Sequence, residues 1–380
     1  MRKHLAALWA LLIAITVLSG CMGNIELNEI HIVHSIAIDQ VEGQDGRIKL
    51  TAEIAKLTPS GQQPKGMQND KFYLSYEGDS LFEAARLMRN KSDRTLLWGH
   101  TTVILISKDI AKQGIAKHID SIRRLRQIRN TTLLYITEGK AYETLRVSSP
   151  SASITSQVLR GLVEGGEVTA LTRKTKLIEV YQELVNGYKD ITIPAIVRVA
   201  DPAEGGKQIQ QATGLFAFRG ERLAGLMQAA ETKGFLRASN QMNGSVESIG
   251  CGSGKNITFE NITSIGTIRA SLESEPEPLV SIDIHADLNI TSMPCPELEI
   301  TPKYVHDWEI RLNETIAEEV RAFTRYSQRH KVDLLGVGER LHRKYPGKWK
   351  SLKEDWEERY SSVRFEITVH SRIDHSNFIM

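Results

Sequence analysis

The glycine-rich segment Gly250–Lys255 has some features of a phosphate-binding loop. Such a loop holds phosphate with the backbone N–H groups of a Gly-rich turn, followed by a Lys and then a Ser or Thr. Here Ile249 stands where the pattern requires its first Gly, and Asn256 follows the Lys. The nucleophile elbow of hydrolases also fails, because Cys251 occupies a position that must be Gly. We therefore interpret this segment as a turn without catalytic or phosphate chemistry.

Histidines supply metal ligands and general bases in many sites, but their spacing here supports neither role. His31 and His34 are three residues apart in a predicted strand, so their side chains point to opposite faces and do not suit one metal ion. His100 has no acid or nucleophile at a recognisable spacing, and we interpret it as a core or capping residue. The sequence predicts no catalytic residue, no metal site and no cofactor.

Cys21 is the residue for which the sequence predicts covalent chemistry. Arg2 and Lys3 are basic, Leu5–Val17 is almost continuously apolar, and Leu18–Cys21 reads Leu-Ser-Gly-Cys. An apolar run of this length is short for a ~30 Å hydrocarbon core but is typical of a secretory signal. The ending has the form of a lipobox, whose thiol forms a thioether with a diacylglycerol. We predict a lipoprotein signal peptide at residues 1–20 and S-diacylglycerol and N-acyl groups on Cys21; the alternative is a buried cysteine ending an anchor helix.

The other two cysteines, Cys251 and Cys295, would then lie on the oxidising, exported side of the membrane. A disulfide between them is one interpretation, but two cysteines alone set no geometry, so the sequence leaves the pairing open.

Four arginines form the densest charge cluster: Arg123, Arg124, Arg126 and Arg129. On a helix they would spread over a broad face opposite Ile119. Such a face could bind anionic headgroups or an acidic partner, or it could be a solvated helix face with one or two salt bridges. We favour the second interpretation.

Composition describes a globular chain with more than one folding unit. The 380 residues include 48 Lys and Arg against 46 Asp and Glu, with 41% hydrophobic residues, and single cores stop growing at roughly 250–300 residues. Loss of Arg2 and Lys3 with the signal peptide leaves a formally neutral chain, which argues against nucleic-acid binding. No other apolar run approaches the length of a membrane span, so we expect an exported, membrane-tethered ectodomain.

The elements that must position these residues are mixed helices and strands. Ser80 is a predicted N-cap with Glu83 completing a capping box, and the segment Asp201–Gln211 is interpreted as a linker. Alternation that leaves one face polar favours antiparallel sheets. The predicted strands are 32–38, 48–57, 96–107, 133–137, 214–219, 223–226, 282–290 and 365–369, and the predicted helices begin at 81 and span 109–129 and 301–331.

A series of landmarks in fixed order resembles one protein family. They are Glu26–Ile30, Ile36–Asp39, Glu77–Ala85, Leu97–His100, Thr213–Phe218, Asp333–Glu339, Tyr345–Trp349 and Trp356. Following a lipobox Cys21, they resemble the C-subunit lipoproteins of bacterial spore germinant receptors, the Ger(x)C family. Two departures concern local loops: Leu125-Arg126 replaces the acidic residue and Pro that tend to follow Arg124, and Ser376 stands near a usual Gly.

The resemblance implies a non-enzymatic receptor subunit needed for the assembly or signalling that triggers spore germination. It would be lipid-anchored on the outer face of the spore inner membrane, beside integral membrane A and B subunits. The implied fold is α+β, or mixed α/β: a multidomain ectodomain with mixed and antiparallel sheets flanked by helices. We expect an N-terminal domain at 21–200 and a C-terminal domain at 201–380, the whole dividing into two or three units. Nutrient binding by this subunit is left open.

Two other classes compete with this interpretation. A lipid-anchored solute-binding protein of a transporter predicts two similar lobes with parallel sheets and a ligand cleft between them. An anchored hydrolase is disfavoured because no nucleophile and base have a recognisable spacing.

We expect the segment Asp333–Trp356 to organise the structure around it. Gly336 and Gly338 supply backbone freedom, and Trp349 and Trp356, seven residues apart, would share one face of a helix if that stretch is helical. The alternative is an exposed aromatic patch that faces a membrane subunit.

Overall fold

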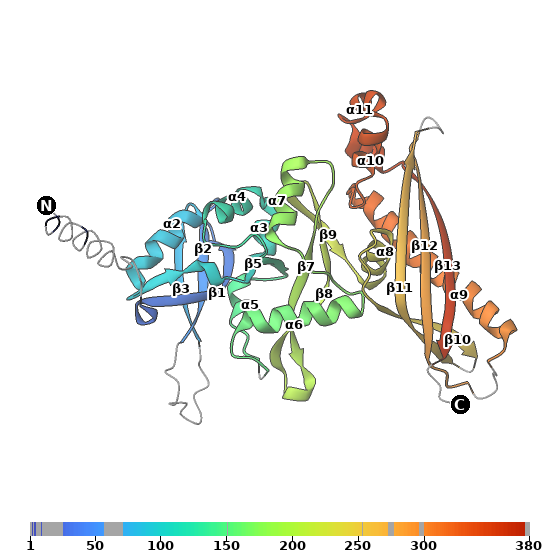
Figure 1. Ribbon diagram of the computed structural model, residues 1–380, viewed down its shortest axis with the longest axis horizontal. Coiled ribbons are helices and arrows are strands. Elements are labelled where there is room, and N and C mark those ends of the chain that lie inside the picture. The colour runs from blue at the N-terminus through green and yellow to red at the C-terminus, as the bar shows by residue number, and fades with distance from the viewer. Residues whose placement is uncertain are drawn as a thin grey trace.

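A computed structural model describes residues 26–56, 71–149, 151–252, 254–272, 277–295 and 300–376, together with Arg2, His4 and Trp9. Two β-sheets and the helices packed on them account for this part of the chain (Figure 1). Cys21, with its predicted lipidation, lies outside the described residues. The α+β class with mixed and antiparallel sheets is confirmed.

The larger sheet has nine strands in the order β3-β2-β1-β5-β6-β7-β8-β9, with β4 paired to β1. Parallel pairs from β1 to β7 form its centre, and antiparallel hairpins flank them on both sides. The strands are β1 (Ile30–Gln40), β2 (Ile48–Ala55), β3 (Lys71–Gly78), β4 (Thr95–Leu97), β5 (Val103–Ser107), β6 (Leu133–Thr137), β7 (Thr192–Asp201), β8 (Lys207–Arg219) and β9 (Arg222–Met227).

Helices cover both faces of this sheet, which explains why its central strands are continuously apolar. One face packs on α2 (Leu81–Leu87), α3 (Lys108–Gln113), α4 (Ala116–Arg124) and α7 (Leu177–Asn186). The other packs on α5 (Ala141–Leu145) and α6 (Thr155–Val168). Figure 1 shows α6 and α4 on opposite sides of the strands.

The smaller sheet has the order β10-β11-β12-β13, with β12 and β13 parallel and the other pairs antiparallel. Its strands are β10 (Ser245–Gly252), β11 (Lys255–Ser271), β12 (Leu279–Ser292) and β13 (Arg364–Ser376). Between β12 and β13 come α9 (Pro302–His330), α10 (Val337–Lys344), α11 (Pro346–Leu352) and α12 (Trp356–Tyr360). As predicted, β12 alternates between buried apolar residues and a more exposed polar face.

The two sheets are joined through α8 (Ala229–Ala238), which lies between them (Figure 1). One core cluster contains residues of β8, β9, α8, the smaller sheet and α9. Gly234 permits the close approach of α8 to α9, because a Cβ there would lie 2.1 Å from the Glu319 carbonyl oxygen.

Three sequence predictions about elements are wrong in detail. The strand predicted at 96–107 is interrupted by the 3₁₀-helix η3 (Trp98–His100). The helix predicted at 109–129 breaks at Gly114, whose φ of 128° is unfavourable for other residues, and it ends at Arg124. The predicted linker Asp201–Gln211 is a hairpin connection between β7 and β8, with the 3₁₀-helix η4 (Pro202–Glu204) at its turn.

The remaining short helices are the 3₁₀-helices η1 (Leu27–Glu29) and η2 (Met88–Lys91). Among the described residues, none of the helices has the length and apolar character needed to cross a bilayer.

Candidate functional site at the junction of the two sheets

Asp190 forms hydrogen bonds between the two halves of the molecule, the N-terminal half built on the larger sheet and the C-terminal half built on the smaller sheet. It lies between α7 and β7, and its Oδ2 accepts a hydrogen bond from the Asp333 backbone N–H at 2.7 Å. Its Oδ1 accepts from the Gly220 N–H at 2.7 Å, at the turn between β8 and β9. Its own backbone N–H donates to the Asp333 carbonyl at 3.0 Å. One residue therefore links a loop and a turn of the larger sheet to the segment that follows α9.

The carboxylate of Asp333 organises the segment that follows it. It accepts from the backbone N–H groups of Val337 at 2.8 Å and Gly338 at 2.7 Å, which lie in the first turn of α10. It also accepts from Nε1 of Trp356 at 3.2 Å. Two otherwise unpaired helix N–H groups and an indole N–H are thereby satisfied by one buried side chain.

Both glycines of this segment are required by the packing around the aspartate. Gly336 has a φ of 65°, the left-handed conformation that glycine adopts without strain. A Cβ on Gly338 would lie 2.7 Å from the Trp349 ring and 2.8 Å from Trp356 Nε1. Trp349 is buried and its ring contacts that of Trp356 edge to face, with centroids 5.1 Å apart. The stretch is not one continuous helix: α11 and α12 are separate, and the two indoles meet across their junction.

The two carboxyl groups have perturbed acidities. Burial raises the pKa of Asp333 to about 6, and the nearby Asp190 carboxylate raises it further, against the hydrogen bonds donated by Gly338 and Val337. Burial also raises the pKa of Asp190 to about 6, against its two backbone hydrogen bonds. Removing the carboxylates from water therefore outweighs the hydrogen bonds they accept.

A cavity of about 360 Å³ adjoins this pair of aspartates. Its lining includes Glu183, Tyr188, Lys189 and Trp356, which bring opposite charges and aromatic rings to one place. These groups can hold a small polar molecule or ordered water between the halves. They supply no recognisable nucleophile and base pair among the described lining residues.

Arg237 on α8 forms a second buried polar centre that the sequence did not indicate. Its side chain is fully buried, and Nε donates to Glu319 on α9 at 3.0 Å. Its terminal nitrogens reach Glu247 on β10 and Asn261 on β11. Lys233 contacts both glutamates, at 3.2 Å and 3.3 Å. This network ties α8 to the smaller sheet and to α9, so it is a structural centre of the C-terminal half.

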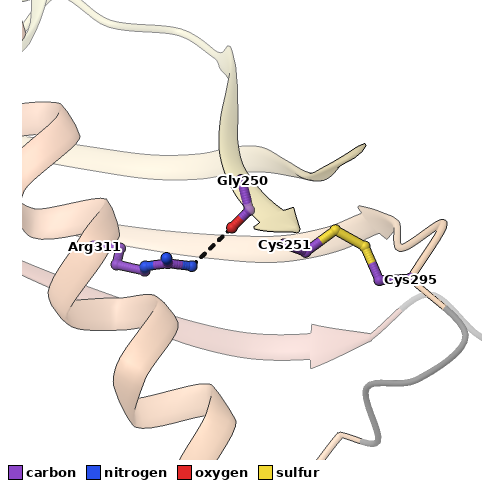
Figure 2. The surroundings of a disulfide bond; sticks show 4 residues. All are labelled: Gly250, Cys251, Cys295 and Arg311. Atoms are coloured by element: carbon purple, nitrogen blue, oxygen red, sulfur yellow. Dashed lines mark hydrogen bonds between the residues drawn. A yellow bond between two sulfur atoms is a disulfide. The ribbon is translucent and has the colours of Figure 1, made fainter. Parts of the chain in front are cut away.

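The cysteine pairing that the sequence left open is formed. Cys251 and Cys295 are joined by a disulfide that links the end of β10 to the segment after β12, as Figure 2 shows. The neighbouring carbonyl of Gly250 accepts a 2.7 Å hydrogen bond from Arg311 on α9. Gly250–Gly252 end β10 and Lys255 begins β11, so the β10–β11 hairpin turns between Gly252 and Lys255, within the segment predicted to be a turn.

Of the histidines singled out by the sequence, His34 and His100 lie close enough to interact electrostatically, whereas His31 has a different partner. His31 contacts Asp93 at 2.8 Å, whereas burial lowers the pKa of His34. His100 is exposed at the end of η3, so the core alternative for this residue is wrong, and the capping alternative stays a prediction. Among the described residues, three or more His, Cys, Asp or Glu side chains do not gather in a group that could hold a metal ion.

The four clustered arginines separate into different environments. Arg123 stacks over the ring of Tyr181 at 3.5 Å, and Arg124 forms a 2.7 Å ion pair with Asp120 one turn earlier in α4. Arg126 lies beyond the end of α4 and is exposed. Arg129 lines a different depression of the surface. The salt-bridge interpretation is therefore confirmed for Arg124, but the four do not share one helix face.

Comparison with known proteins gives matches in both halves of the chain. Residues 23–198 match the family described as "Spore germination protein N-terminal domain". Residues 213–377 match "Spore germination B3/ GerAC like, C-terminal". The fold is similar to that in "Crystal Structure of the GerBC protein", with a TM-score of 0.59 and 19% identity over 89% of this chain and 96% of that one.

Curated relatives span almost the same length as this chain. "Spore germination protein KC" of Bacillus subtilis (strain 168) is 24% identical over 375 residues, covering 94% of this chain and 92% of the relative. "Spore germination protein YndF" of the same organism is 21% identical and covers 99% of this chain and 97% of the relative. Because both family regions match in order, this chain belongs to the Ger(x)C family of spore germination proteins.

Proposed function

We propose that this protein is the lipid-anchored C subunit of a nutrient germinant receptor, and that it acts in assembly or signalling without catalysing a reaction. The observation that carries the proposal is the presence of both family regions, in order, behind a predicted lipobox. The partners are the integral membrane A and B subunits, and the location is the outer face of the spore inner membrane. Two domains, 21–200 and 201–380, form the ectodomain in this proposal.

The contacts at the junction of the two sheets support a role in transmitting movement from one half of the protein to the other, rather than in catalysing a reaction. Asp190 and Asp333 connect the halves through backbone hydrogen bonds, so a displacement of one half is resisted by the other. The rival solute-binding protein predicts two similar lobes with parallel sheets. Here the larger sheet is mixed and covered on both faces, and the smaller one is mainly antiparallel, so the two halves are dissimilar.

The receptor role is tested by deleting the gene and scoring the spores against a panel of nutrient germinants. Loss of the response to particular nutrients, with an unchanged response to a non-nutrient trigger, is expected. Spores that respond normally to every nutrient, or that fail with every trigger, would contradict a receptor subunit.

The anchor is tested by Cys21→Ala in cells labelled with a palmitate analogue. The variant is expected to lose the label and leave the membrane fraction, because the alanine side chain cannot form the thioether. Ser19→Ala keeps a small residue in the lipobox and is the matched control, which should stay labelled. Labelled, membrane-bound Cys21→Ala protein would refute lipidation at this residue.

A further inference from the structure

A basic groove with an exposed aromatic ring lies at the end of the larger sheet where the chain enters the fold. It has a volume of about 470 Å³ and lies between α2, η3 and the segment after α4. Three arginines line it: Arg86, Arg124 and Arg126. No acidic side chain is among the described residues that line this groove. The chain without residues 1–20 is formally neutral, so the positive charge of this groove is a local feature and does not reflect a basic protein surface as a whole.

The aromatic part of the groove has an exposed and a buried member. The Phe82 side chain is 50% exposed, and the Arg86 guanidinium lies 5.1 Å from its ring centre. Trp98 is buried beneath, and its backbone N–H donates to Gln127 at 3.2 Å, which fixes the loop after α4 against η3. An exposed aromatic ring beside cationic groups is the combination that favours the interface of an anionic bilayer.

Arg124 and Arg126 of the groove are exposed enough to bind an anion from outside the protein. Arg124 is 76% exposed, and its partner Asp120 lies on the same helix in solvent, a kind of pair worth little in water. Arg126 is exposed, with no ion pair recorded among the described residues. Glu83, on α2, accepts a hydrogen bond from the Asp79 N–H at 2.8 Å and does not line the groove. Of the three arginines, Arg124 has an acidic partner, whereas Arg86 and Arg126 form no ion pair with another described residue.

The groove lies near the start of β1, the part of the fold that follows the predicted lipid anchor, and this position favours a membrane lipid as its ligand. The first residues of β1 pair with β4, so Ile30 lies beside Thr95, three residues before Trp98. The chain makes nine residue-to-residue steps from Cys21 to Ile30, and an extended chain of that length reaches at most about 30 Å. A lipid on Cys21 therefore holds this end of the larger sheet close to the membrane surface, within reach of its headgroups.

We infer that the groove of Phe82, Arg86, Arg124 and Arg126 docks on anionic phospholipid headgroups of the bilayer that holds the Cys21 lipid. Each arginine near an anionic surface adds only a small favourable contribution to binding. Three such contacts are too weak to recruit the protein from solution, but the tether makes the contact intramolecular and so favourable. The docked groove would fix the orientation of the ectodomain above the membrane. This inference rests on the anchor proposed above.

The test uses the full processed protein reconstituted into vesicles. One set is pure phosphatidylcholine, and the other contains about one-third phosphatidylglycerol as the anionic lipid. Hydroxyl-radical labelling then compares Phe82 with Tyr304, an aromatic residue on α9 that is 37% exposed. Labelling of Phe82 relative to Tyr304 should fall by about threefold or more in the anionic vesicles and recover in high salt.

Two triple variants with the same change in net charge identify the groove. Arg86→Gln/Arg124→Gln/Arg126→Gln should abolish the protection of Phe82. Arg269→Gln/Arg325→Gln/Arg372→Gln, which changes exposed arginines of the C-terminal half, should leave it intact. Equal effects of the two variants, equal protection in both vesicle types, or protection of Phe82 by inorganic phosphate without vesicles would each overturn the proposal.

Failure of the anchor and failure of the groove give different results. The mass of the N-terminal peptide in the same sample reports lipidation directly. If Cys21 carries no lipid, the chain is attached by an N-terminal histidine tag to vesicles that contain a nickel-chelating lipid, and the labelling is repeated. Absence of protection in that tethered protein would refute the groove independently of the anchor.

Discussion

Single polar side chains hold the connections of this fold in place, and several lie in the segments that resemble the family. The Asp39 carboxylate, at the end of Ile36–Asp39, accepts from the backbone N–H groups of Ala141 and Tyr142 at the start of α5. Ser80 caps α2 through the Glu83 N–H, as predicted, but Glu83 reaches back to Asp79 rather than to Ser80 itself. The capping role is therefore confirmed and the reciprocal bond is shifted by one residue.

Asp190 and Asp333 should make stability depend on pH. Their folded pKa of about 6 lies above the ordinary value of 3.8, so between these values the folded state binds more protons than the unfolded state. Their contribution to the free energy of unfolding is therefore present at low pH and is lost as pH rises through about 6. Glu357 raises and Arg219 lowers the pKa of Asp190, and Asp190 raises that of Asp333.

We expect Asp333→Asn to be more costly at pH 5 than at pH 7, with the difference about 1 kcal/mol. The variant removes a group whose stabilising protonation is available only below pH 6. Urea unfolding at both pH values measures this difference. Asp307→Asn, at an exposed position of α9, is the control and should show none. An equal cost of Asp333→Asn at both pH values would contradict the assignment.

At the scale of elements, α10 to α12 wrap an aromatic cluster around one carboxylate. Trp349, Trp356 and Tyr360 form successive edge-to-face contacts, with centroids 5.1 Å and 5.9 Å apart. Trp349 and Tyr360 are buried, and Trp356 is partly buried beside the cavity at the junction. The expected role of this segment as an organiser thus has a physical basis in the Asp333 hydrogen bonds and this cluster.

Trp356→Ala should lower the free energy of unfolding by about 2–4 kcal/mol, because it removes both the ring contacts and the hydrogen bond to Asp333. Trp356→Phe keeps a ring but lacks the N–H donor, so its cost should be intermediate. Urea midpoints of the two variants measure the order. An unchanged midpoint for Trp356→Ala, with failure of the variant to assemble in spores, would make this residue part of an interface instead.

The network around Arg237 connects α8, α9 and the smaller sheet, so its loss should lower the free energy of unfolding of the C-terminal half. Arg237→Met leaves Glu247 and Glu319 with Lys233 as their cation, and breaking a buried pair in this way costs about 3–5 kcal/mol. Arg325→Met, which breaks an exposed pair with Glu318, is the matched control and should cost less than about 1 kcal/mol.

Thermal or urea unfolding measures both variants. The triple variant Arg237→Met/Glu247→Gln/Glu319→Gln should recover part of the loss, since the two buried carboxylates that lost their arginine are removed. Lys233, which is partly exposed, still donates to the Val246 carbonyl. If Arg237→Met and Arg325→Met cost the same, the buried network does not stabilise the fold as argued.

At the scale of the whole molecule, three kinds of interaction hold the structure together. Apolar packing of α8 connects the two sheets, and hydrogen bonds between Asp190 and Asp333 connect the larger sheet to the segment after α9. The disulfide connects the end of β10 to the segment after β12, within the smaller sheet's part of the chain. The division at residue 200 stays a prediction. The larger sheet continues from β7 through the hairpin into β8 and β9.

The disulfide closes a loop with a sequence separation of 44 residues. On loop-closure entropy, a bond over such a loop restricts the unfolded chain by up to about 4 kcal/mol. We expect Cys251→Ser/Cys295→Ser to lower the free energy of unfolding by about 2–4 kcal/mol, measured by urea titration. A reducing agent should lower the stability of the native protein to that of the double variant and leave the variant unchanged. Stability that does not respond to the reductant would show that this bond is absent in the protein in solution.

The sequence alone determined the elements with strong local signals. Alternation located β12, the caps Thr301 and Lys331 bound α9 as predicted, and Ser80 began α2, because each depends on residues within a few positions of one another. The ordered landmarks also determined the family, since they need no knowledge of contacts. The two periodicities indicated a mixture of helices and strands, and the family resemblance implied the fold class.

Tertiary structure decided which distant groups meet. The sequence did not single out Asp190 or Arg237, because their partners are 143 and 82 residues away. The breaks at Gly114 and η3 occur where packing overrides a continuous apolar pattern. The groove of Phe82, Arg86 and Arg126 likewise combines separate elements. Local sequence sets the conformation of short segments, whereas burial and charge pairing depend on chain topology, which brings distant residues together.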